Sequence, residues 1–200
     1  MLAIKESRDH LLPWMPWAKD DQHLDNEEMK QMLISMFSEQ FHSGLDYPYG
    51  IFLRPPQLTD GQQQHQEVFV GSTGLHPRIE PKNEAMEIGY WMHVDHLNRG
   101  LCTEAVRALV CVGFDHLRLK TLEIHSERNN QLSQRIPKRL GFQPSAHPSE
   151  HDVIVWTLHR EDYIKMLEHH HDQSQNDNQW NNTLATLEIF DDDGTRVYPC

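Results

Sequence analysis

One stretch of the chain decides the fold: AMEIGYWMHVDHLNRGLCTEAVRALV, residues 85–110. Its first part, Ala85 to Val94, is rich in apolar and aromatic residues and predicts a strand. A turn containing Gly100 follows, and the apolar residues after it recur at helical spacing. Backbone amides at the start of such a helix can point into one concavity and bind an anion. The stretch therefore predicts a strand–turn–helix unit with a niche for phosphate, although many turns of this composition serve only helix entry.

The segments around this stretch alternate between strand and helix patterns. Strands are expected at 49–53, 67–75, 121–125 and 152–158, and helices at 1–12, 25–44 and 132–140. Pro13 ends the first of these helices, and Gly141 closes the last. Met29, Met32 and Met36 recur at helical spacing and are expected in the core. The alternation predicts a mixed α/β fold, with helices layered on a central sheet.

Composition restricts the class of protein. The 200 residues include 18 Lys plus Arg against 30 Asp plus Glu, a formal charge of −12. The negative charge and the scattered basic residues argue against a nucleic-acid partner. Apolar runs fall short of the roughly 20 residues that a bilayer needs, so no membrane association is expected. Three cysteines and the polar start of the chain favour the cytoplasm.

The length predicts one full domain with an appendage. Residues 1–165 are expected to form that domain. The polar segment 166–182, rich in His, Asn and Gln, is expected to be a linker, and 183–200 is expected to form a β-hairpin.

Several segments together resemble the GNAT acetyltransferase superfamily, and within it the RimJ/RimL-like branch. They are Glu87-Ile88-Gly89-Tyr90-Trp91, His96 to Ala105, Asn130-Gln131-Leu132-Ser133 and Arg139-Leu140-Gly141-Phe142, together with the opening from Ser7 to Trp17. Their order and spacing agree with the family. The resemblance implies a GNAT acyl-CoA N-acyltransferase fold over 1–165, with a central mixed, splayed sheet flanked by helices. The first strand of that fold is expected to be missing from this chain.

The resemblance also implies acetyl-CoA as the acyl donor. By position, the residues that would bind it are Met92, His93, Val94, Arg99, Gly100, Leu101, Cys102, Thr103 and Asn130. The acyl-CoA signature is altered at two places, because Leu97 stands where Arg or Gln is usual and Cys102 where Gly or Ala is usual. We therefore expect weaker cofactor binding.

Two residues are expected to carry the chemistry by the same resemblance. Glu87 lies where some relatives have a general base, although an ordinary solvent-facing strand glutamate would fit the sequence equally well. Ser133 lies where RimL-like enzymes place a serine proposed to protonate the coenzyme A thiolate, and it also suits the first turn of a helix. Pro137 replaces the tyrosine acid of many superfamily members. A backbone amide near Met92 or His93 is expected to hold the oxyanion.

The acceptor is expected to be a primary amine, either a protein N-terminus or a small molecule, and direct transfer in a ternary complex is expected. Trp14, Trp17 and Tyr90 are the predicted acceptor contacts, and packing of helix ends is the alternative for the tryptophans. No metal site is expected, since no set of ligands completes a first shell around the histidines. A homodimer is compatible with the sequence. The competing reading is a noncatalytic module with the GNAT fold.

Overall fold

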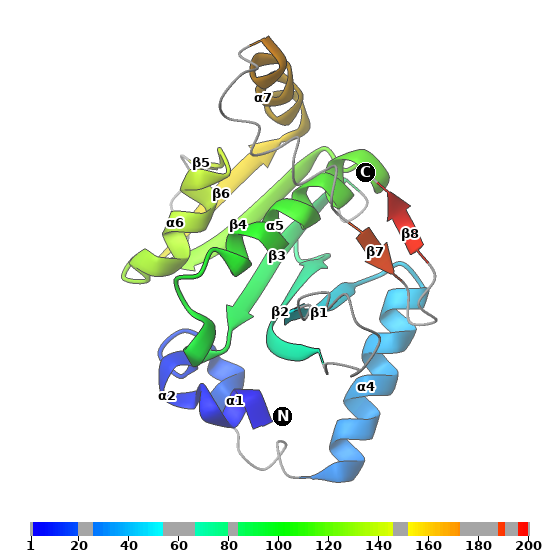
Figure 1. Ribbon diagram of the computed structural model, residues 1–200, viewed down its shortest axis with the longest axis vertical. Helices are drawn as coiled ribbons and strands as arrows, with labels where there is room; N and C mark the ends of the chain where they lie inside the picture. Colours follow the sequence, from blue (N-terminus) through cyan, green and yellow to red (C-terminus); the bar gives the residue numbers. More distant parts are fainter. Residues whose placement is uncertain are drawn as a thin grey trace, which may run out of the picture. The chain divides into compact units, whose positions relative to one another are not determined.

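The computed structural model describes residues 2–19, 26–53, 67–79, 84–145, 152–172, 188–190 and 196–199 (Figure 1). The helical elements are α1 (Leu2–Glu6), α2 (Arg8–Leu11), η1 (Pro16–Lys19), α4 (Glu27–His42), η2 (Val94–His96), α5 (Leu101–Cys111), the π-helical η3 (Val112–His116), α6 (Gln131–Arg139) and α7 (Arg160–Asp172). The strands are β1 (Tyr47–Leu53), β2 (Val68–His76), β3 (Ala85–Met92), β4 (Thr121–Glu127), β5 (Gln143–Pro144), β6 (Val153–His159), β7 (Glu188–Phe190) and β8 (Arg196–Pro199).

The strands confirm the mixed α/β class. Six of them form one sheet in the order β1-β2-β3-β4-β6-β5, and β7 pairs with β8 separately. The β1–β2 and β4–β6 pairs are antiparallel, whereas β3 and β4 run parallel. Within the described ranges, no helix is both long and apolar enough to span a bilayer.

The chain divides into two compact units, and the division falls inside β3. The first unit comprises Met1–His76 and Gly89–Cys102, and the second comprises Pro77–Ile88 and Thr103–Cys200. The sequence expectation of one domain over 1–165 does not anticipate this division.

The N-terminal segment of the first unit is broken by a buried serine. A single helix was expected over 1–12, but α1 ends at Glu6 and α2 begins at Arg8. Ser7 between them is only 1% exposed, and its hydroxyl accepts a hydrogen bond from the Val94 amide at 3.0 Å. This bond ties the N-terminal helices to the start of η2, just after β3.

Helix α4 begins and ends as its sequence predicts. The Asn26 side chain caps its N-terminus by accepting from the Met29 amide at 3.0 Å, and Gly44, with φ +71°, follows its end. However, none of its residues is buried, and Met32 is 56% exposed. The prediction that Met29, Met32 and Met36 lie in the core is wrong. Near the C-terminus of α4, Phe41 lies edge-on to Tyr47 and Tyr49 of β1.

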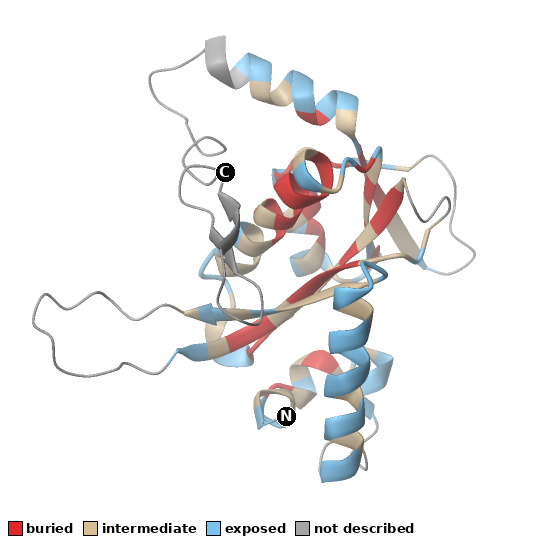
Figure 2. Ribbon diagram, turned by 90° about the vertical axis from the view of Figure 1, so that its right-hand side faces the viewer, coloured by how far each residue is buried: buried red, intermediate tan, exposed pale blue. Residues whose placement is uncertain are grey.

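In the second unit, the buried residues that form the core lie in strands and in a helix (Figure 2). Alternate residues of β4 and β6 are fully or nearly fully buried there, as are apolar residues of α5: Leu122, Ile124, Trp156, Leu158, Val106, Leu109 and Val110. The indole of Trp156 donates a hydrogen bond to the Ser126 hydroxyl at 2.9 Å in this core. Since strand residues alternate between faces, Glu123 and His125 lie on the opposite, polar face.

The C-terminal region is more helical than its composition suggests. Helix α7 continues to Asp172, so residues 166–172 of the expected linker are helical. Tyr163 anchors its first turn, because the buried ring stacks on Phe114 and its hydroxyl donates to Asp115 Oδ2 at 2.7 Å. The rest of the expected linker lies outside the described residues. Strands β7 and β8 pair antiparallel, as expected for a hairpin. The turn expected at its tip, residues 191–194, lies outside the described residues.

Candidate functional site

The turn before α5 provides an open stretch of backbone. Asn98 has φ +58° and Gly100 has φ +82°, so both adopt the left-handed conformation that reverses the chain before the helix. Apart from its two chain neighbours, a Cβ atom added to Gly100 would meet no atom of the described part of the chain within 4 Å. Helix α5 starts at the next residue, Leu101. The geometry therefore presents the first amides of α5 beside empty space, as binding of an anion at a helix N-terminus requires.

Arg99 supplies the positive charge of this turn. It is exposed, and its Nη1 lies 3.4 Å from Nδ1 of His96. Burial, and secondarily the charge of Arg99, lowers the pKa of His96. His96 is therefore neutral at physiological pH, and Arg99 carries the charge that would meet a phosphate.

The first turn of α5 contains the three remaining predicted loop residues, Leu101, Cys102 and Thr103, all partly buried. Burial raises the pKa of the Cys102 thiol to about 12. At neutral pH only roughly one such thiol in 10⁵ is ionised, so Cys102 is not poised as a nucleophile.

The two backbone amides that follow β3, those of His93 and Val94, donate hydrogen bonds within the first unit. The His93 amide donates to the Val70 carbonyl at 2.8 Å, and the Val94 amide donates to Ser7 Oγ at 3.0 Å. This geometry does not favour the His93 amide as the oxyanion donor. Met92, whose side chain is buried, stays the predicted donor.

The His93 side chain links η2 to the N-terminal helices. Its Nδ1 accepts from the Asp95 amide at 3.1 Å, which leaves Nε2 to donate to Glu6 Oε2 at 2.9 Å. The ring is only 9% exposed. His93 is therefore a buried support of the chain where it leaves β3.

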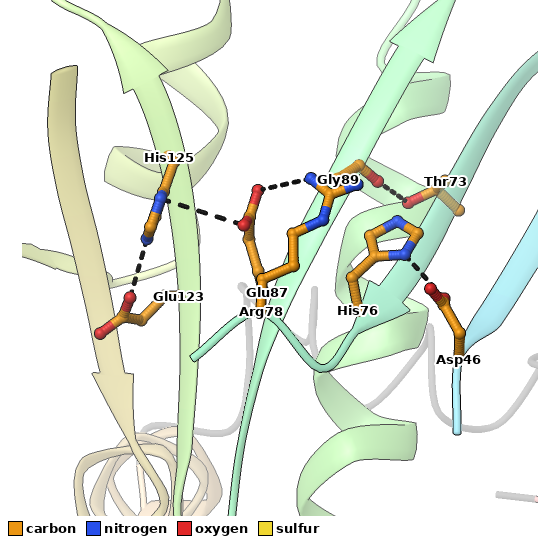
Figure 3. Close-up of polar contacts among 8 residues, drawn as sticks. All are labelled: Asp46, Thr73, His76, Arg78, Glu87, Gly89, Glu123 and His125. Carbon is orange, nitrogen blue, oxygen red and sulfur yellow. Dashed lines mark hydrogen bonds and ion pairs between the residues drawn. The ribbon is translucent and has the colours of Figure 1, made fainter. Parts of the chain in front are cut away.

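Glu87 lies in a cluster of charged side chains in the second unit (Figure 3). It faces Glu123 directly in the parallel β3–β4 register, and its side chain is only 12% exposed. Arg78 Nη1 lies 3.4 Å from Glu87 Oε1, and His125 Nδ1 lies 3.9 Å from Glu87 Oε2. The alternative interpretation, in which Glu87 is an ordinary solvent-facing carboxylate, does not agree with its low exposure and its charged neighbours.

His125 also bonds to the second carboxylate of the cluster. Its Nε2 lies 2.8 Å from Glu123 Oε2, and this hydrogen bond is the largest cause of a raised pKa for His125. Arg78, Glu123 and His125 were not predicted as site residues. The Glu-x-His spacing within an expected strand places the last two on one face, but the register that sets them beside Glu87 is not evident from the sequence.

Another histidine, His76, packs against two glycines in the first unit (Figure 3). His76 Nδ1 lies 2.7 Å from Asp46 Oδ1. Cβ atoms added to Gly74 and Gly89 would come within 2.7 and 3.2 Å of the His76 ring. Gly89, part of the stretch that resembles GNAT proteins, therefore has a local packing role.

The N-terminus of α6 contains the other predicted catalytic residue. Asn130 is the N-cap, and its Oδ1 accepts from the Ser133 amide at 3.1 Å. Ser133 lies in the first helical turn and is partly buried. This confirms the first-turn position of Ser133, and it shows that Asn130 rather than Ser133 is the cap. The roles of both residues toward coenzyme A stay predictions.

The aromatic cluster of the first unit contains Trp17, Trp91 and Phe69. Of these, only Trp17 was predicted to contact the acceptor. Trp17 is 46% exposed and lies edge-on to Trp91, with ring centroids 6.1 Å apart, and Trp91 contacts Phe69 at 5.8 Å. Tyr90 precedes Trp91 in β3 and so points to the other face of the strand from the Trp17 contact. Trp14 is partly buried. Trp91, which was not predicted, is the partner of Trp17.

Comparisons with known proteins bear on the family and the fold of the chain. The acetyltransferase (GNAT) domain family matches residues 2–143. YdaF of Bacillus subtilis is 28% identical over 96 residues, which are 44% of this chain and 52% of YdaF. The ribosomal-protein-serine acetyltransferase of Escherichia coli is 34% identical over 65 residues, covering 32% of this chain and 36% of that protein. The chain thus matches about half, or less, of the length of these two curated relatives.

One solved structure similar to this fold is the ribosomal L7/L12 alpha-N-protein acetyltransferase RimL in complex with coenzyme A. The superposition has a TM-score of 0.62 and covers 79% of this chain and 85% of RimL, at 19% identity. At that identity the likeness establishes a shared fold.

Proposed function

Because the chain belongs to the acetyltransferase (GNAT) domain family, we propose that it transfers the acetyl group of acetyl-CoA to a primary amine. The observation that carries this proposal is the open backbone at Gly100, where an added Cβ atom would meet no atom of the described residues within 4 Å beyond its chain neighbours. Acetyl-CoA is the cosubstrate expected in this family, and RimL, which shares the fold, has been solved with coenzyme A.

The residues of the turn fit the phosphates of acetyl-CoA. Amides at the start of α5 would donate to phosphate oxygens, and Arg99 would add charge-assisted hydrogen bonds. Leu97 supplies no polar contact, so the affinity depends mainly on the backbone and on Arg99.

The chemistry requires a neutral amine, and Glu87 is the group proposed to take its proton. The amine nitrogen then attacks the thioester carbonyl, a C–N bond forms, and the C–S bond breaks. The thiolate leaves as coenzyme A, with Ser133 proposed to protonate it. The nitrogen loses its second proton as the amide forms, and this proton restores the Ser133 hydroxyl. Transfer is direct in this scheme, since the Cys102 thiol, with a pKa raised to about 12, is a poor acyl carrier.

We propose the N-terminal α-amine of a protein as the acceptor. Its reference pKa of about 7.7–8.0 leaves part of it neutral at physiological pH, whereas lysine, at about 10.4, needs more help from a base. The name of the Escherichia coli relative, a ribosomal-protein-serine acetyltransferase, supports this class. The exposed rings of Trp17 and Phe52 offer apolar area to a peptide. The three cysteines of the chain are sparse and odd in number, so we place the reaction in the cytoplasm.

Two measurements test the proposal. In a thermal-shift titration, acetyl-CoA should raise the melting temperature, because a ligand at 100 times its Kd stabilises the native state by about 2.7 kcal/mol. Release of free thiol should then be assayed with peptides that have free or blocked N-termini, and with small amines. We expect turnover only with the free peptide N-termini. Absence of both a thermal shift and thiol release would favour the noncatalytic module, and turnover restricted to small amines would replace the proposed acceptor.

A further inference from the structure

We propose that His125 is a positioning residue that acts through Glu87: it receives the proton that Glu87 removes from the acceptor amine, while Glu123 holds its ring. This inference rests on the proposed function and adds a step to it. The supporting residues all lie in the second unit, on β3, β4 and the segment before β3.

The strand register sets up the arrangement. Glu87 and Glu123 occupy directly opposed positions of the parallel β3–β4 pair. Like charges at opposed positions of a sheet destabilise it, so two carboxylates there need compensation. Arg78 places a permanent positive charge on one side of Glu87. His125 lies on the other side and is positively charged only when its ring is protonated. The cluster is therefore built to accept one proton reversibly.

The hydrogen bonds fix which ring nitrogen receives that proton. An ionised carboxylate can only accept, so the 2.8 Å contact with Glu123 requires that His125 Nε2 carry the hydrogen. In the neutral ring, the lone pair then lies on Nδ1. That atom is 3.9 Å from Glu87 Oε2, a separation that a small side-chain rotation or one water closes.

The proton balance is complete without another reactant. An N–H bond of the acceptor ammonium breaks as an O–H bond forms on Glu87. That O–H bond then breaks as an N–H bond forms at Nδ1 of His125. The resulting imidazolium lies between two carboxylates, and 32% of its side-chain surface is exposed, so the proton passes on to solvent and the neutral ring is restored.

The surroundings make the ring basic enough for this task. The charged groups facing His125 are Glu123 on its own strand, Glu87 on β3, and Arg78. Its register partner on β6 is the apolar Val155. The bond to Glu123, followed by the charges of Glu87 and Glu123, outweighs burial and Arg78 and raises the pKa of His125. The protonated ring cannot accept, so activity should fall as pH drops through this raised pKa.

A pH profile of kcat/KM, measured on the full chain, tests the assignment. In wild type, the acidic limb should lie above the ordinary histidine value of about 6.5. Glu123→Gln should move that limb to lower pH. His125→Lys keeps a positive charge beside Glu87 but accepts no proton at neutral pH, so kcat/KM at pH 7 should fall at least tenfold. His159→Gln is the matched control, because His159 shares this face of the sheet but lies against the Thr121 hydroxyl, and it should leave the profile unchanged.

Histidine titration by NMR gives a second readout that needs no activity. The His125 pKa should fall in both Glu123→Gln and Glu87→Gln. If His125→Lys retains wild-type kcat/KM, or Glu123→Gln moves neither the acidic limb nor the His125 titration, His125 only neutralises charge and the inference is overturned while acetyl transfer stands. If wild type neither binds acetyl-CoA nor releases thiol, the proposed function fails, and the inference fails with it.

Discussion

Gly100→Ala separates binding of the donor from folding. Gly100 has φ +82°, and an L-residue in that conformation costs about 1–2 kcal/mol. Among the described residues beyond its chain neighbours, the added methyl group would meet no atom within 4 Å, so backbone strain is the cost expected in the free protein. In the complex, however, the same methyl group would lie where the phosphate approaches the backbone.

Two quantities are therefore measured for this variant. Urea denaturation gives the free energy of unfolding, which should fall by about 1–2 kcal/mol. Isothermal titration with coenzyme A gives the Kd, which should rise at least tenfold, equivalent to about 1.4 kcal/mol of lost binding free energy.

Gly44→Ala is the matched control. Gly44 has φ +71° at the end of α4, and a Cβ atom there would lie 3.2 Å from the Tyr47 hydroxyl. The strain should be similar, but the Kd for coenzyme A should stay at its wild-type value. If Gly100→Ala binds coenzyme A as wild type does, or if both variants weaken binding equally, the reasoning that places phosphate at Gly100 is refuted.

Three further substitutions give separate expectations. Ser133→Ala should lower kcat more than it raises the Kd for acetyl-CoA, and equal turnover in both proteins would remove Ser133 from the mechanism. Cys102→Ala should retain activity within about twofold, since a thiol with a pKa of about 12 is protonated; an acetylated Cys102 trapped by mass spectrometry would contradict direct transfer. Ser7→Ala leaves the Val94 amide without its acceptor. In urea denaturation, the free energy of unfolding should therefore fall by about 1–3 kcal/mol. A change below about 0.5 kcal/mol, the scatter of surface substitutions, would show that water replaces the hydroxyl.

Local signals in the sequence located most elements of the fold. Gly44 and Gly141 end helices with φ +71° and +85°, as glycine at those places predicts. The strand–turn–helix around Gly100 follows from the chain itself, because strand composition, a turn glycine and helical periodicity succeed each other there. Such features depend on a few neighbouring residues and are therefore visible without a structure.

Features that depend on distant partners were not visible. His125 joins Glu87 only because β3 and β4 pair in one register, and a shift of one residue would send its side chain to the other face. The exposure of Met32 has a similar origin, since helical periodicity indicates an apolar face but not whether a partner covers it. Tyr90 and Trp91 are equally aromatic, and only the side chain of Trp91 meets Trp17.

The shallow packing of α4 has a consequence for local unfolding. An isolated helix of 16 residues is marginal in water, and tertiary burial normally supplies what local propensity lacks. Because α4 buries none of its residues, its amides should exchange with deuterium through fluctuations far smaller than global unfolding. Those of α5, which contains the buried Val106 and Val110, should exchange only on much larger openings.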